Sequence, residues 1–146
     1  MNLKRVPMEF QNVIVKDISE KGLSLQDISE VKLNALYQGV FTTGPILVEG
    51  KWGKGYQKLM IPVNTEIEFK EHTGFSFLEK LRLDDGIYYR NGEEDFSELP
   101  VRSIMDKIAN DLNVHLSDTY YCIILNVYGG KLYDIYVPVK SEEQND

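Results

Sequence analysis

YDIYVPV at residues 133–139 and QKLMIPV at residues 57–63 end in the same Pro-Val pair, 76 positions apart in the chain. Both stretches are typical of a strand, because apolar residues recur in them with a period of two. A shared ending of this kind indicates an internal repeat, and a repeat decides the fold before any local feature does.

The repeat extends well beyond these two stretches. When residues 24–63 are compared without gaps with residues 100–139, seven of the 40 aligned pairs are identical. That identity is low, and the order of the expected elements carries more weight. Each half is expected to contain a strand, a helix and two further strands.

The first unit, residues 8–70, is expected to contain strands at 9–16, 43–50 and 57–63. Ser24, with Asp27 three residues later, forms the start of a helix that resembles a capping box. The apolar stripe of this helix is expected to be Leu25, Ile28, Ala35 and Leu36, which recur at helical spacing.

The second unit, residues 75–140, is expected to contain strands at 75–83, 119–127 and 133–139. Ser97 can cap its helix, and Pro100 is tolerated in the first turn. The stripe of this helix is Val101, Ile104, Met105, Ile108 and Leu112.

These two units predict an α+β fold with pseudo-twofold symmetry, in which both helices lie on one face of an antiparallel sheet. The whole chain, residues 1–146, is expected to be one domain, with a polar tail at 141–146. Strand alternation assigns Leu59, Ile61, Val63, Ile135, Val137 and Val139 to the face under the helices. Tyr56, Lys58, Met60, Leu132, Asp134 and Tyr136 are expected to form the opposite, amphipathic face, which is left uncovered.

Tandem units of this order whose strands end in Ile/Val-Pro-Val resemble the gyrase-inhibitor-like (GyrI-like) small-molecule-binding superfamily. That superfamily includes the effector-binding domains of bacterial multidrug-sensing transcription activators, and the SOUL haem-binding proteins are distant relatives. The resemblance covers roughly residues 8–140 and is carried by TGP at 43–45, IPV at 61–63, LDDGIYY at 83–89, ELPVRSIMDKIANDL at 98–112 and DIYVPV at 134–139.

The resemblance implies a ligand cleft between the two halves, lined by aromatic side chains and often holding a buried acid for lipophilic cations. Asp134 occupies the acidic position, and Tyr88 and Tyr89 fall in the aromatic segment. The expected ligand-binding residues are Tyr56, Lys58, Met60, Tyr88, Tyr89, Asp134 and Tyr136. An alternative is that Asp134 and Lys58 form an ion pair across the sheet with no role in binding.

Composition excludes several other classes of protein. The net charge of −7 disfavours direct binding of nucleic acid. The sequence contains no run of 18 apolar residues, the length needed to cross a membrane as a helix. The single cysteine, Cys122, excludes a disulfide framework and favours the cytoplasm. His72 and His115 are far apart, so neither a metal site nor any other cofactor is expected.

The expected function is therefore a bacterial binding module for a small amphipathic or aromatic molecule, without a DNA-binding region of its own. The first alternative is a protein-interaction module, for which Trp52 in the turn GKWGKG could be the anchor. The second alternative is a hydrolase with an acid in the cleft, for which Glu49, Glu66 and Glu68 are the nearest candidates.

Overall fold

The computed structural model describes residues 3–18, 22–69, 74–93, 98–127 and 129–140. The elements are β1 (Leu3–Arg5), β2 (Met8–Asp17), α1 (Leu25–Tyr37), β3 (Ile46–Lys51), β4 (Gly55–Pro62), β5 (Phe75–Leu83), β6 (Gly86–Glu93), α2 (Glu98–Leu112), β7 (His115–Leu116), β8 (Thr119–Val127) and β9 (Gly130–Lys140). The predicted α+β class is confirmed as a mostly antiparallel sheet with two helices. Neither helix is long and apolar enough to span a membrane.

Both helices form where the sequence predicts them, but α1 buries a different stripe. The predicted capping box is present, since Ser24 and Asp27 exchange hydrogen bonds at the start of α1. Val31 and Ala35 face the core, whereas Leu25 and Leu36 are exposed, so the predicted stripe was wrong at both of its ends. The proposed cap of α2, Ser97, lies outside the described residues.

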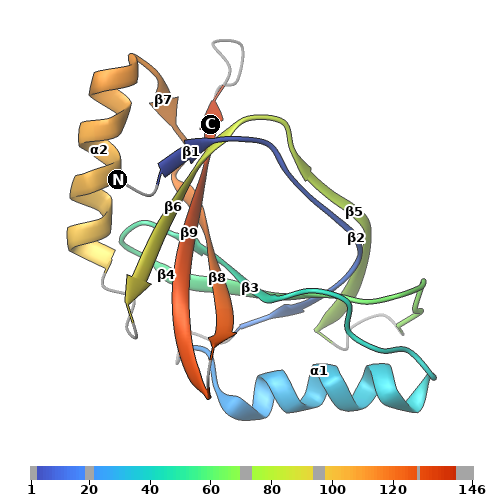
Figure 1. Ribbon diagram of the computed structural model, residues 1–146. Coiled ribbons are helices and arrows are strands. Elements are labelled where there is room, and N and C mark those ends of the chain that lie inside the picture. The colour runs from blue at the N-terminus through green and yellow to red at the C-terminus, as the bar shows by residue number, and fades with distance from the viewer. Residues whose placement is uncertain (1–2, 19–21, 70–73, 94–97, 128, 141–146) are drawn as a thin grey trace.

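The strands follow the order β1-β6-β9-β8-β3-β4-β2-β5, with β7 beside β9. The ends of this order are joined by the chain itself, because β1 continues into β2 and β5 continues into β6 after two residues each. The β1–β2 segment runs antiparallel to the β5–β6 segment along its length, so the ladder closes into a distorted barrel. Figure 1 shows these two long segments arching side by side over the top of the molecule.

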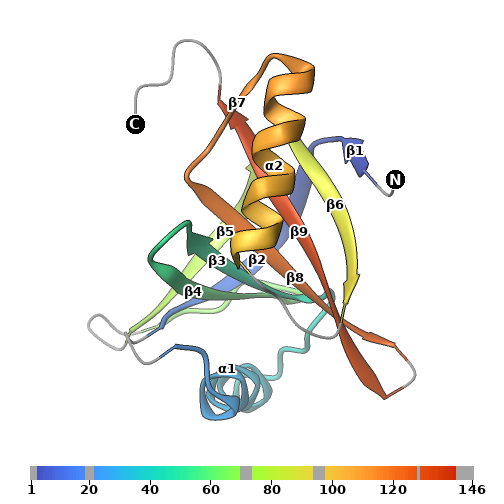
Figure 2. The ribbon, with the colours of Figure 1, turned by 90° about the vertical axis from the view of Figure 1, so that its left-hand side faces the viewer.

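This closure corrects two expectations. The strand expected at 75–83 exists, but it pairs with β2 of the first unit. In the second unit, the strand that pairs with β9 is β6. The amphipathic face is also not left uncovered, because Met60, Asp134 and Tyr136 lie inside the barrel. Figure 2 shows α2 packed across β8 and β9 on the outside, with α1 seen end-on below.

The outside of the barrel carries the larger core, which we name the outer cluster. It joins the buried residues of α1 and α2 to one side of the strands, and its members are Ile14, Val31, Ala35, Val40, Val48, Leu59, Ile61, Val63, Ile67, Ile87, Val101, Met105, Ile108, Tyr120, Cys122, Ile124, Ile135 and Val137. Strand alternation assigned five of these residues, Leu59, Ile61, Val63, Ile135 and Val137, to one apolar face, and all five belong to this cluster.

The inside of the barrel holds a second core, the inner cluster. Its members are Met8, Val13, Val15, Leu47, Met60, Leu81, Tyr121, Ile123 and Tyr136. These side chains come from six strands around the ring, which is possible only because the sheet closes on itself. The barrel is therefore filled by its own side chains.

Asn12 allows both halves of β2 to face this interior. Met8 and Phe10 precede it and Val13 and Val15 follow it, and all four contact the inner cluster although the two pairs differ in parity. Asn12 has a φ of 54°, in the left-handed region that asparagine tolerates better than most residues. The alternation changes at Asn12 and also on the paired strand β5, where Leu81 and Leu78 both contact the inner cluster although the register stays constant.

Two glycines give tyrosine rings room to cross the backbone of a neighbouring strand. A Cβ atom on Gly50 of β3 would overlap the ring of Tyr120, which faces the outer cluster. A Cβ atom on Gly86 of β6 would overlap the ring of Tyr136, which faces the inner cluster. Each face of the barrel thus has one glycine covered by one tyrosine.

Candidate functional site

Three tyrosines lie side by side across the inside of the barrel. Tyr88 of β6 is opposite Tyr136 of β9, and Tyr136 is opposite Tyr121 of β8. Directly opposed residues on one face of an antiparallel sheet have Cβ atoms about 5 Å apart, so the three side chains form one row. With their acceptors, they make up what we name the inner tyrosine network.

Asp134 is the acceptor at one end of this network. Its carboxylate is 1% exposed, and its Oδ2 accepts a hydrogen bond from the Tyr88 hydroxyl. Nε of Arg90 lies 3.3 Å from the same oxygen, so the buried charge has a cationic partner at the surface. Burial, and then the bond to Asp134, raises the pKa of Tyr88, which stays a neutral donor.

The other two tyrosines have separate acceptors. The Tyr121 hydroxyl donates to Oε1 of Glu49 over 2.9 Å, and the Tyr136 hydroxyl donates to the carbonyl oxygen of Val6 over 2.7 Å. Burial raises the pKa of Tyr121 further above its usual value than that of Tyr136, which rises to about 12. Both hydroxyls therefore stay protonated at neutral pH and donate hydrogen bonds inside the barrel.

The structure separates the predicted ligand-binding residues. Met60, Tyr88, Asp134 and Tyr136 belong to the inner face or its network. Tyr89 lies on the opposite side of β6 from Tyr88 and packs on the outer cluster.

Tyr56 also lies on the outer face, so its predicted place beside Lys58 and Met60 was wrong. The pairing between β3 and β4 shifts after Glu49, so that Gln57 has no opposite residue and the next side chain turns to the other face. Tyr56 packs there beside Cys122. Burial raises the pKa of the Cys122 thiol to about 12, which makes it a poor nucleophile at neutral pH.

The predicted alternative, an ion pair between Asp134 and Lys58, was also wrong. Three steps in the strand order separate β9 from β4, about 14 Å at the usual spacing between strands. Asp134 is bound by Tyr88 and Arg90 instead. Lys58 is exposed and lies opposite Glu49 and Asp17 in the two neighbouring strands.

Trp52, the predicted partner anchor, has partners within the chain. Its ring lies 4.3 Å from that of Tyr120, and its amide donates to the carbonyl oxygen of Asp118. The next amide, that of Gly53, donates to Glu98 at the start of α2. The turn between β3 and β4 is therefore fixed to the rest of the molecule.

The candidate acids of a hydrolase do not form a shared site. Glu66 and Glu68 are exposed residues after β4, whereas Glu49 lies on the barrel wall and is bound by Tyr121. Tyr121 is 5% exposed, so only Glu49 of this pair reaches the surface. No group of three or more His, Cys, Asp and Glu side chains within the described ranges could hold a metal ion.

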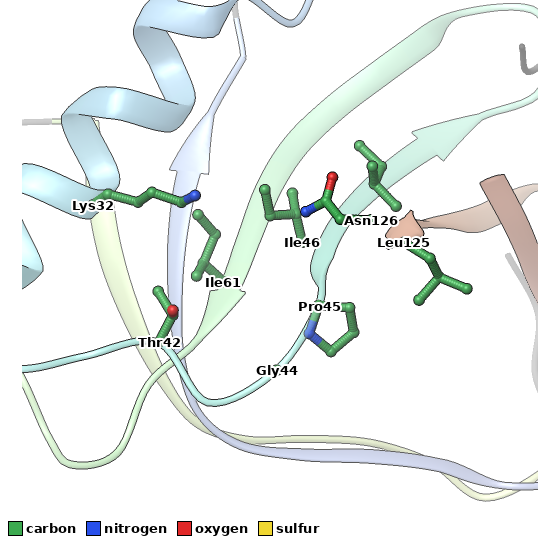
Figure 3. A pocket seen from close by; sticks show the side chains of 9 residues that line it. Lys32, Thr42, Gly44, Pro45, Ile46, Ile61, Leu125 and Asn126 are labelled. Carbon is green, nitrogen blue, oxygen red and sulfur yellow. The ribbon is translucent and has the colours of Figure 1, made fainter. Parts of the chain in front are cut away.

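The first accessible hollow lies between α1 and the sheet, and we name it the seam groove. It has a volume of about 380 Å³ and is lined by Lys32, Thr42, Gly44, Pro45, Ile46, Ile61, Ile124, Leu125 and Asn126. Figure 3 shows the Lys32 side chain extending from α1 over Ile61, and the Asn126 amide pointing toward Ile46. The groove spans the contact between β3 and β8.

The second hollow lies between α2 and the strands β1 and β6. It has a volume of about 430 Å³ and is lined by Leu3, Tyr89, Ile104, Lys107, Ile108, Asp111 and Leu112. Of the seven predicted ligand-binding residues, Tyr89 alone lines either hollow. The sequence signal for the seam groove was the TGP segment at 43–45, which supplies Gly44 and Pro45.

No family model matches the chain, and no curated protein matches it.

Proposed function

We propose that this protein binds a small amphipathic molecule with an anionic head group, and that the seam groove is the binding site. Its volume of about 380 Å³ falls within the range of roughly 300–1,000 Å³ that is usual for such sites. The head group would lie beside Lys32, and the apolar part would lie on the isoleucines of the sheet.

The distribution of polar groups around the groove carries this proposal. Lys32, Thr42 and Asn126 offer an ammonium, a hydroxyl and an amide, and all three can donate hydrogen bonds. Among the described residues that line the groove, none is acidic, although the chain has 23 acidic and 16 basic residues. A site with one cation and no carboxylate, in a chain with net charge −7, favours an anion over a cation.

The position of the groove agrees with the resemblance to the GyrI-like superfamily, which implies a cleft between two tandem units. The sequence β2–α1–β3–β4 has the strand order β2-β4-β3, and β6–α2–β8–β9 has the order β6-β9-β8. Both helices bury side chains in the outer cluster. These features support two tandem units with their helices on one face, and such units meet where β3 pairs with β8.

The contacts of Asp134 argue against a site for lipophilic cations inside the barrel. Its carboxylate is buried and bound by Tyr88 and Arg90, so a cationic ligand would have to displace Arg90. It would also have to open a core in which Met60 and Tyr136 are at most 4% exposed.

The test compares three compounds with the same ten-carbon chain, namely decanoate, decanol and decyltrimethylammonium. Decanoate at a hundred times its dissociation constant should stabilise the protein by about 2.7 kcal/mol in thermal unfolding. Lys32→Gln should weaken decanoate binding about tenfold, because it removes the cation. Lys107→Gln, a matched change of an exposed lysine on α2, should leave it unchanged.

Equal stabilisation by all three compounds would remove the anionic head group from the proposal. A decanoate effect that Lys32→Gln leaves intact would place the site elsewhere. The absence of any stabilisation would count against the binding function itself.

A further inference from the structure

The side of α1 that faces away from the barrel is unusually apolar. Four large side chains of the helix and one just after it are exposed, and we name them the α1 patch: Leu25, Leu33, Leu36, Tyr37 and Phe41, with exposed fractions of 74%, 49%, 70%, 85% and 65%. In Figures 1 and 2, no described element covers this side of α1. We infer that the α1 patch is the contact surface of a symmetric homodimer.

Three of these residues lie together on the helix. Leu33, Leu36 and Tyr37 are spaced by three and four residues, so they lie on one face of the helix. Phe41 follows the helix and exposes its ring, while its amide is held by the side-chain oxygen of Asn64. The patch is therefore displayed on a fixed segment.

The exposed area agrees with what one partner of a stable dimer contributes. An aromatic side chain offers roughly 200 Å² and a leucine roughly 100 Å², so the exposed fractions give roughly 500 Å² of apolar area. A standard interface buries about 800 Å² on each partner, of which about 57–65% is apolar, or about 500 Å². This area lies within the roughly 300–600 Å² of the largest apolar patch on a typical monomer, and such patches are often functional.

The segments of this sequence outside the described ranges are MN, SEK, KEHT, EDFS, a single Tyr and SEEQND, and none carries more than one large apolar residue. A second copy of the chain, in contrast, supplies a surface of the same area. A two-fold axis uses that one surface twice and closes the assembly.

The charges on α1 also permit two copies to meet. Its two acidic residues, Asp27 and Glu30, both bind Lys16 of β2, each with an N–O distance of 2.6 Å. The single charge of Lys16 offsets one of these carboxylates, and Lys32, the only basic residue of the helix, offsets the other. The patch can thus pair with its own copy although each chain carries a net charge of −7.

The experiment is sedimentation velocity of the full chain over concentrations from about 1 to 200 μM, the range in which standard interfaces associate. The expected species has twice the 16.8 kDa mass of the chain. Leu36→Glu should weaken the dimer at least tenfold, because it places a carboxylate in the apolar contact. Circular dichroism and thermal unfolding should remain close to those of the wild type, since Leu36 is exposed.

Leu99→Glu is the matched control, because Leu99 is exposed to a similar extent but lies on α2. This variant should dimerise like the wild type. A wild-type protein that stays monomeric at the highest concentration would overturn the inference. So would a dimer that Leu36→Glu leaves intact, a dimer that Leu99→Glu weakens equally, or association that continues beyond two copies.

Discussion

The two faces of the barrel wall are both dry, yet they are built differently. The outer cluster is mainly aliphatic and is covered by the two helices. The inner cluster includes or contacts three tyrosines, whose hydroxyls donate hydrogen bonds to Asp134, Glu49 and a backbone carbonyl. An amphipathic pattern of residues therefore does not by itself predict that one face of a sheet is exposed to water. Where a sheet closes, polar side chains can be inside if each finds a partner.

The largest expected effect comes from the two glycines that tyrosines cover, one on each face. Gly50→Ala and Gly86→Ala should each lower the free energy of unfolding by about 3 kcal/mol, because the new methyl group overlaps a ring with little room to move. Urea unfolding measures this change. Similar losses would show that the two faces are packed to the same density.

Gly44→Ala is the graded control for this pair. A Cβ atom there would lie 3.2 Å from Cγ of Pro62, so the neighbour must move only slightly and the loss should be below about 1 kcal/mol. A loss at Gly86 as small as that at Gly44 would mean that the inner face is loosely packed. An interior cavity for a ligand would then regain support.

The second effect tests the hydrogen bond between Tyr88 and Asp134 inside the barrel. Asp134→Ala should cost about 2 kcal/mol in urea unfolding, because the Tyr88 hydroxyl loses its acceptor inside the barrel. Asp134→Asn should cost about half as much, since the amide oxygen can still accept. Equal losses for both variants would show that the charge of Asp134, and not the hydrogen bond, stabilises the barrel.

The third effect concerns the ion pairs that Lys16 of β2 forms with Asp27 and Glu30 of α1. The hydrogen bond from Lys16 holds the pKa of Asp27 below its usual value. Asp27 therefore contributes stability above about pH 4, and this contribution is lost as the pH falls through the lowered pKa. Lys16→Met should remove about 1 kcal/mol at pH 7 and flatten the decline between about pH 5 and pH 2.

Lys131→Met is the control for this third test, because Lys131 is an exposed lysine of β9. It should leave the pH dependence of urea unfolding unchanged. A decline below pH 5 that is just as steep in Lys16→Met would assign the acid sensitivity to other carboxylates.

The smallest effect is expected for Arg90. Its side chain is 59% exposed, so water and salt screen its attraction to Asp134. Arg90→Gln should leave the midpoint of urea unfolding unchanged within error, both at low salt and at 0.5 M NaCl. A clear loss at low salt would mean that the buried carboxylate depends on this surface cation.

The sequence predicted the fold as far as local patterns reach. The capping box at Ser24, the Pro-Val strands and the apolar side of these strands all follow from spacing between near neighbours. The closure of the barrel was not predictable in this way, since it depends on β1 pairing with β6, more than 80 residues later. The exposed ends of the α1 stripe were missed because leucines at helical spacing look alike whether or not a partner covers them.

The candidate site was less accessible to sequence reasoning. The row of three tyrosines requires the register of three strands, and the position of Tyr56 depends on a shift of one residue that no pattern marks. The seam groove combines Lys32 from α1 with Asn126 from the end of β8, which are neighbours only in the folded chain. The spacing of residues along the sequence does not predict such a pair.

The position of β9 in the ring has a consequence for how the chain folds. Among the described strands this one comes last along the sequence, yet it lies between β6 and β8. Its Tyr136 reaches back over 130 residues to Val6. During synthesis, the edges of β6 and β8 that pair with β9 therefore stay unpaired until β9 leaves the ribosome. Such a chain is expected to fold slowly, in milliseconds to seconds, and to depend on chaperones during that interval.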